Sequence, residues 1–136
     1  MEFELEGQTY RVNKIDARSQ FHIVRRLAPV IGELAPALQG GKGGVDALPP
    51  LANAIAKLSD ADADYCLFGL LKALSRKQPQ GTGWGPVTTG DLLMYDDISM
   101  PAMLQLAWRA MSHNMQGFFA ALPSDLQEVA QRAKGQ

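Results

Sequence analysis

The chain has 136 residues, of which 46% are hydrophobic and 20% charged, and its formal net charge is -1. This balance is typical of a folded domain with a real core, and it argues against an intrinsically disordered chain and against a nucleic-acid-binding or anionic-lipid-binding protein. The single cysteine excludes an internal disulfide, and no apolar run approaches the roughly 20 residues that a membrane span needs. The acidic start does not resemble a secretory signal, so we expect one soluble cytoplasmic domain, residues 1–136.

Residues 1–13 are predicted to form an antiparallel β-hairpin. In EFELEGQTYRV, apolar and polar side chains alternate on both sides of a glycine. A two-residue turn at Gly7-Gln8 would set the register, with these apolar pairs: Leu5 with Tyr10 and Phe3 with Val12. A two-stranded hairpin is marginal by itself, so its apolar face should pack against the rest of the domain.

A helical body is predicted from residue 14 to residue 122. Asp16 is a candidate N-cap for the first helix, whose apolar residues recur at spacings of three and four. Pro29 removes a backbone hydrogen bond, which predicts a kink or break there. The predicted apolar stripe consists of Ala17, Phe21, Val24, Ala28, Ile31, Ala35 and Leu38, widened by Leu27 and Leu34.

A glycine-rich loop over 39–48 should connect to a second helix that begins at the Pro49-Pro50 pair. Ser59 is a candidate N-cap of a third helix, with aspartates in its first turn. We expect this helix to end at Arg76 and Lys77, because basic residues are favoured at helix C-termini. It is apolar on nearly all sides, which predicts burial by this domain or by another subunit.

A loop is predicted over 78–91, with a short hairpin around Val87 and residues 92–95. A long helix should follow from Met100 to about Leu122, and a polar helix over 123–136 should be peripheral. The fold class is therefore mainly α (α+β), with about four to five helices and a small N-terminal antiparallel β-hairpin.

Two adjacent carboxylates, Asp96 and Asp97, are the first candidates for catalytic or metal-binding chemistry. Neighbouring side chains on an extended segment point in opposite directions, which does not suit a shared acid-base or cation site. Ser99 and Pro101 match the N-cap and first turn of the long helix, whose N-terminus favours nearby negative charge. We interpret the two aspartates as residues that precede a helix start.

Other candidates for chemistry are equally weak. His22 and His113 are far apart in sequence and lack partners at metal-ligand spacing. Cys66 lies in an apolar segment with no base beside it. The glycine-rich stretches 40–44 and 81–85 match neither the phosphate-loop nor the dinucleotide-binding pattern. We therefore expect no catalytic residue, metal ligand or cofactor, and a protein that is not an enzyme.

Methionines are concentrated in one part of the chain: Met94, Met100, Met103, Met111 and Met115. Flexible thioether side chains suit either a core or an adaptable apolar surface, and one helix can supply both. The candidate partner-binding residues form a stripe on the long helix: Leu104, Trp108, Met111, Met115 and Phe118.

Three stretches of this sequence together resemble the tail assembly chaperones of contractile-tailed bacteriophages and prophages. They are FELEGQTYRVNKIDARSQFHIVRRLAPV, LSDADADYCLFGLLKALSRK and LLMYDDISMPAMLQLAWRAMSHNMQGFF, which cover most of the chain to about residue 120. The glycine-rich loop at 40–44 and the polar tail after Leu122 are regions in which we expect the family to vary.

The resemblance implies a non-enzymatic protein of the bacterial host cytoplasm, encoded by a phage or prophage. Its expected partner is the tape measure protein, a long helical chain that it keeps soluble, and it helps to recruit tail tube subunits before leaving. Exposed apolar helices would also favour a homo-oligomer, with no nucleic acid or membrane partner. The alternative is a structural tail or adaptor subunit that remains in the particle.

Overall fold

The computed structural model describes residues 2–30, 32, 34, 48–78, 83–90 and 92–121, with only the backbone described for 116–121. Within these ranges it has four α-helices: α1 (Ala17–Leu27), α3 (Leu48–Ala56), α4 (Asp60–Leu71) and α5 (Met100–Ala121). A 3₁₀ turn, η1 (Ala28–Val30), extends α1. The strands are β1 (Glu2–Leu5), β2 (Gln8–Val12), β3 (Leu74–Lys77), β4 (Trp84–Pro86), β5 (Thr88–Thr89) and β6 (Leu92–Leu93).

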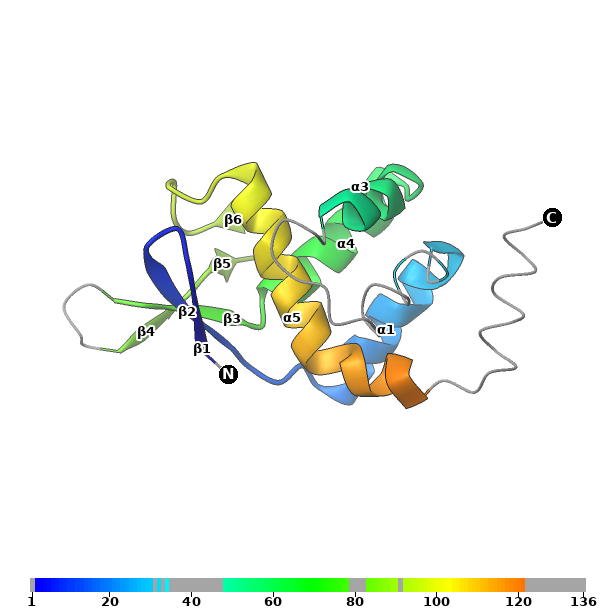
Figure 1. Ribbon diagram of the computed structural model, residues 1–136, viewed down its shortest axis with the longest axis horizontal. Helices are drawn as coiled ribbons and strands as arrows, with labels where there is room; N and C mark the ends of the chain where they lie inside the picture. Colours follow the sequence, from blue (N-terminus) through cyan, green and yellow to red (C-terminus); the bar gives the residue numbers. More distant parts are fainter. Residues whose placement is uncertain are drawn as a thin grey trace.

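The four longer strands form one antiparallel sheet in the order β1-β2-β3-β4, and β5 pairs with β6 in a second, two-stranded sheet. Figure 1 shows α5 crossing the molecule between this sheet and the other helices. The mixed α+β class is therefore confirmed, but the β part is larger than a hairpin. Strand β4 occupies part of the 78–91 segment, for which the sequence predicted a loop. The pairing of β5 with β6 confirms the short hairpin that was predicted around Val87 and residues 92–95.

The N-terminal hairpin is present, but its predicted register is wrong by two residues. Phe3 pairs with Tyr10, and the turn is Glu6-Gly7 instead of Gly7-Gln8. Both turn residues have positive φ, 51° and 80°, as a type I′ turn requires. A shift of two residues leaves the same side chains on each face, so Tyr10 still contributes to the core.

Helix α1 begins where the sequence predicted, but its buried face matches the predicted stripe only in part. Asp16 Oδ2 accepts a hydrogen bond from Ser19 N, which confirms the N-cap, and α1 ends just before Pro29. Leu27 and Leu34 of the predicted stripe are buried, but Phe21 is 61% exposed and Ala17 and Ala28 are exposed. The buried face consists of Ile23, Leu27, Val30 and Leu34.

Helix α3 begins at Leu48, so that Pro49 and Pro50 lie in its first turn, close to the predicted start. Helix α4 has the predicted cap, because Ser59 Oγ accepts from Asp62 N at 3.1 Å.

The predicted end of α4 at Arg76 and Lys77 is wrong. The helix ends at Leu71, and the four residues from Leu74 to Lys77 form β3, a central strand of the sheet. Tyr10 pairs with Arg76 and Val12 with Leu74, so this segment lies beside β2 and extends the hairpin into a larger sheet.

Helix α5 runs from Met100 to Ala121, and Ser99 Oγ accepts from Ala102 N as the predicted N-cap. Asn114 attaches this helix to the segment before α1: its Oδ1 accepts from Ile15 N at 2.7 Å, and its Nδ2 donates to Asn13 O at 3.1 Å. The connector at 40–47 and the predicted helix over 123–136 lie outside the described residues.

Candidate partner-binding surfaces

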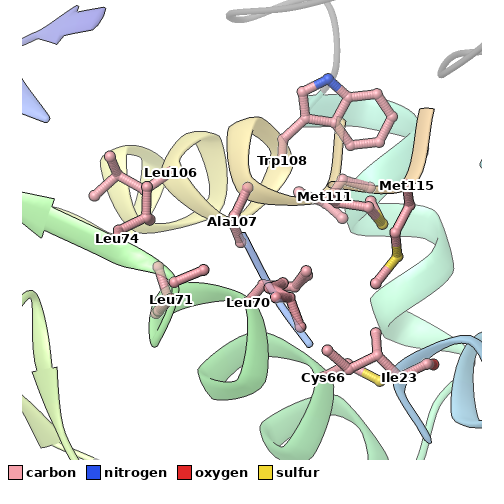
Figure 2. Close-up of a cluster of buried hydrophobic side chains, with 14 of the residues drawn as sticks. Ile23, Cys66, Leu70, Leu71, Leu74, Leu106, Ala107, Trp108, Met111 and Met115 are labelled. Carbon is pink, nitrogen blue, oxygen red and sulfur yellow. Dashed lines mark hydrogen bonds between the residues drawn. The ribbon is translucent and has the colours of Figure 1, made fainter. Parts of the chain in front are cut away.

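The candidate partner-binding stripe on α5 lies largely inside the folded chain. Trp108 and Met111 are 1% exposed and Met115 is 0% exposed, while Leu104 is half-buried. The side chain of Phe118 lies outside the described residues. Figure 2 shows Met111 and Met115 above Leu70 and Ile23, residues that belong to α4 and α1. Contact between a partner and these three buried side chains would require α5 to separate from its neighbours.

A small apolar cavity of about 30 Å³ lies beside this part of α5. Leu104 and Met111 of α5 line it together with Leu51 of α3, Leu67 of α4 and Leu27 of α1. Its walls are almost entirely apolar, and its volume is that of about one water molecule. It is a packing gap between four helices and too small for a partner side chain.

The two adjacent aspartates have different roles. Asp97 forms a bidentate ion pair with Arg76 of β3, with N–O distances of 2.7 and 2.8 Å. The Arg76 guanidinium also lies over the Tyr95 ring, 4.2 Å from its centre. Hydrogen bonding to Arg76 lowers the pKa of Asp97, and both aspartates lie at exposed positions. Asp97 therefore fastens the segment before α5 to the sheet, a role that its position before a helix did not reveal.

Cys66 and the histidines are placed in unreactive surroundings. Cys66 is 4% exposed, and its Sγ lies 3.8 Å from the carbonyl oxygen of Ile23. Burial raises the pKa of the thiol to about 11, so the reactive thiolate is scarce at neutral pH. His22 lies on α1 beside Phe21, with ring centres 5.3 Å apart, and His113 is exposed on α5.

Within the described ranges, no group of three His, Cys, Asp or Glu residues is arranged to hold a metal ion. No helix in those ranges is long and apolar enough to cross a membrane. Among the glycine-rich stretches, 40–44 is outside the described residues, while Trp84 and Gly85 of 81–85 belong to strand β4.

An open groove of about 640 Å³ lies between α4 and the segment that enters α1. We call it the α1–α4 groove. Its lining combines apolar and charged side chains. The residues that line it are Lys14, Ile15, Asp16, Ser19, Ile23, Ala61, Asp64, Tyr65, Phe68, Gly69, Lys72, Ala73 and Gly90.

One face of α4, together with the residue that follows the helix, forms one side of this groove. The lining residues on this side recur at spacings of three and four: Ala61, Asp64, Tyr65, Phe68 and Lys72. The sequence predicted that this helix would be covered on nearly all sides, yet Tyr65 is 39% exposed and Phe68 is only half-buried. The described part of the chain thus leaves an apolar side of α4 open.

Helix α1 holds the rim of the groove in place. Arg26 forms a 2.7 Å ion pair with Asp62, and its guanidinium lies 4.0 Å from the centre of the Tyr65 ring. An ordered aromatic side chain loses little conformational entropy when a partner covers it. The groove is therefore a preformed surface on this chain.

A second exposed apolar region lies at the N-terminal end of α5. Leu92 is 69% exposed, Met94 52% and Met100 68%. The structure thus divides the methionine-rich region, since Met94 and Met100 face outward while Met111 and Met115 are core residues. The core alternative and the surface alternative each hold for part of the cluster.

A family model described as "Phage tail assembly chaperone protein, TAC" matches residues 6–127. The match includes all four α-helices, strands β2 to β6 and every residue that lines the α1–α4 groove. No curated protein and no solved structure matches the chain. The family match covers far more than half of the 136 residues, so the chain belongs to the phage tail assembly chaperone family.

Proposed function

We propose that this protein binds the helical tape measure protein of its phage tail, keeps it soluble, and helps tail tube subunits to assemble on it. The observation that carries the proposal is the family match over residues 6–127. A long helical client has an apolar surface that is bare until the tube surrounds it, so it needs a temporary cover.

The described surface supports a binding role. The open face of α4 offers Tyr65 and Phe68, and the start of α5 offers Met94 and Met100. Methionine and aromatic side chains adapt to varied apolar partners at low cost in conformational entropy. Two of the residues that first suggested chemistry are engaged in the fold, since Asp97 is paired with Arg76 and Cys66 is buried. We therefore propose a non-enzymatic protein that works in the host cytoplasm and associates with copies of itself.

The direct test is co-expression with the tape measure protein encoded near this gene. We expect the tape measure protein to move from the pellet to the soluble fraction and to co-purify with this protein. An unrelated aggregation-prone helical protein serves as the control and should stay insoluble. If the tape measure protein remains insoluble at saturating amounts of this protein, the proposal fails.

Purified particles distinguish a chaperone from a structural subunit. A chaperone that leaves after assembly should be absent from mass spectra of mature particles, while the tape measure protein should be abundant. Detection of this chain at a fixed stoichiometry to the tube subunit would instead establish the alternative, a tail or adaptor subunit.

A further inference from the structure

The α1–α4 groove has a charge order along its length. Asp64 of α4 and Lys72, the residue that caps the C-terminus of α4, both line the groove and lie eight residues apart, which corresponds to about 12 Å along a helix axis. Phe68 lies midway between them on the same row of the helix surface. Within the described ranges neither Asp64 nor Lys72 forms a salt bridge. The groove thus has an acidic end, an apolar middle and a basic end.

The basic end is reinforced by a second lysine. Lys14 lines the same groove as Lys72, and the carboxylate in that region, Asp16, already accepts two hydrogen bonds from Ser19 at the start of α1. Asp16 also attracts Lys72 electrostatically, so the two lysines and this carboxylate leave that end of the groove with one net positive charge. The groove is concave, so it suits a convex occupant such as a single helix.

We infer that the α1–α4 groove binds one amphipathic helix of the client, antiparallel to α4. This helix carries Asp or Glu in its first turn, apolar residues at spacings of three and four, and Lys or Arg seven or eight residues after the acid. Antiparallel docking places its acidic end at Lys14 and Lys72 and its basic end at Asp64. It also opposes the two helix dipoles, which is the favourable arrangement.

Isolated helices are stabilised by acidic residues near the N-terminus and basic residues near the C-terminus, so ordinary amphipathic helices have the charge order that this groove fits. A helix with the reversed order would place like charges together at both ends if it docked antiparallel to α4, and it would align the two helix dipoles unfavourably if it docked parallel. This inference rests on the proposed function for the identity of the client, while the groove itself can be tested with peptides.

The probe is a pair of labelled helical peptides of identical composition, one acid-first and one base-first, titrated against the whole chain at low salt. We expect the acid-first peptide to bind about threefold more tightly or better, because the base-first peptide must either meet like charges or dock with its dipole parallel to that of α4. Exchange of the groove charges, Asp64→Lys with Lys72→Glu, should invert this preference. Equal binding of both peptides by both proteins would overturn the inference.

The matched control exchanges charges outside the groove, Asp96→Lys with Lys77→Glu, and should leave the preference unchanged. Circular dichroism melting checks that both double variants fold. If peptides do not bind but the groove exchange alters the mass of a homo-oligomer in sedimentation, the occupant is a second copy of the chain and the inference is wrong.

Co-expression with the tape measure protein separates the two proposals. If the wild-type chain keeps it soluble and the groove exchange does so equally well, the function stands and the groove is not its site. If the wild-type chain fails there but selects the acid-first peptide, the groove binds helices and the proposed client is wrong.

Discussion

Arg76 and Asp97 show how a single ion pair can determine the position of a helix. Arg76 is 8% exposed, which is rare for arginine unless the side chain is paired, and both of its terminal nitrogens are bound to Asp97. The pair joins β3 to the turn that precedes α5. Removal of the carboxylate would leave a buried guanidinium without its charge partner.

Asp97→Asn should therefore lower the urea midpoint of unfolding at pH 7, while Asp96→Asn at the exposed neighbour should not. The pKa of Asp97 is lowered by Arg76, so its contribution to stability is full above the unfolded-state pKa of about 3.9. That contribution is lost as the pH falls through the folded-state pKa. The urea midpoints of the wild-type chain and the two variants, measured from pH 7 to pH 2, should accordingly converge at the acid end. A difference between the midpoints of the wild-type chain and Asp97→Asn that stays constant at every pH would contradict the ion-pair account.

At the scale of elements, the contact between α1 and α4 depends on a glycine. A Cβ atom added at Gly69 would lie 3.2 Å from Cδ1 of Ile23, which is only 1% exposed. Glycine in a helix costs about 1 kcal/mol relative to alanine, so close packing of the two helices accounts for its presence. The ion pair between Arg26 and Asp62 joins the same two helices at the groove rim.

A double-mutant cycle measures this contact. Gly69→Ala gains helix propensity but crowds Ile23, while Ile23→Val removes the crowded Cδ1 atom and costs about 0.5–1.5 kcal/mol alone. We expect the double variant to be more stable than the sum of the single variants by about 0.5–1 kcal/mol in chemical denaturation. The same cycle with Val24→Ala in place of Ile23→Val is the control and should be additive.

At the scale of the whole molecule, α5 is the element on which the others pack. Its buried side chains contact α3, α4 and the sheet, so the apolar stripe that suggested a binding face is used for folding. The partner binding that we propose would then use surfaces that α5 does not cover, such as the α1–α4 groove.

Met111→Glu tests that assignment. The Met111 side chain is 1% exposed, so a carboxylate at this position should destabilise the chain by about 4 kcal/mol or more, a large part of the stability of a typical domain. His113→Glu places the same side chain on the exposed face of α5 and should change stability by less than about 0.5 kcal/mol. Thermal melts of both variants test whether Met111 is a core residue. A Met111→Glu variant that stays folded but loses client binding would mean that Met111 contacts the partner directly.

The sequence by itself determined the features that depend on neighbouring residues. The caps at Asp16, Ser59 and Ser99 and the break before Pro29 were all readable, because a cap or a proline acts within one helical turn. The faces of the hairpin were readable for a similar reason, since a two-residue error in register leaves them unchanged.

Only the tertiary structure decided which of two possible faces of α1 is buried and where α4 ends. Arg18 and Arg25 share the exposed face with Phe21, a charge signal that could have corrected the first error. The second error had no local signal, because none of the seven residues after Leu71 is a glycine or proline. Pairing of Leu74 and Arg76 with a strand more than 60 residues away overrides helix propensity. The groove likewise joins Lys14 to Lys72, and such distant residues meet only when the chain has folded.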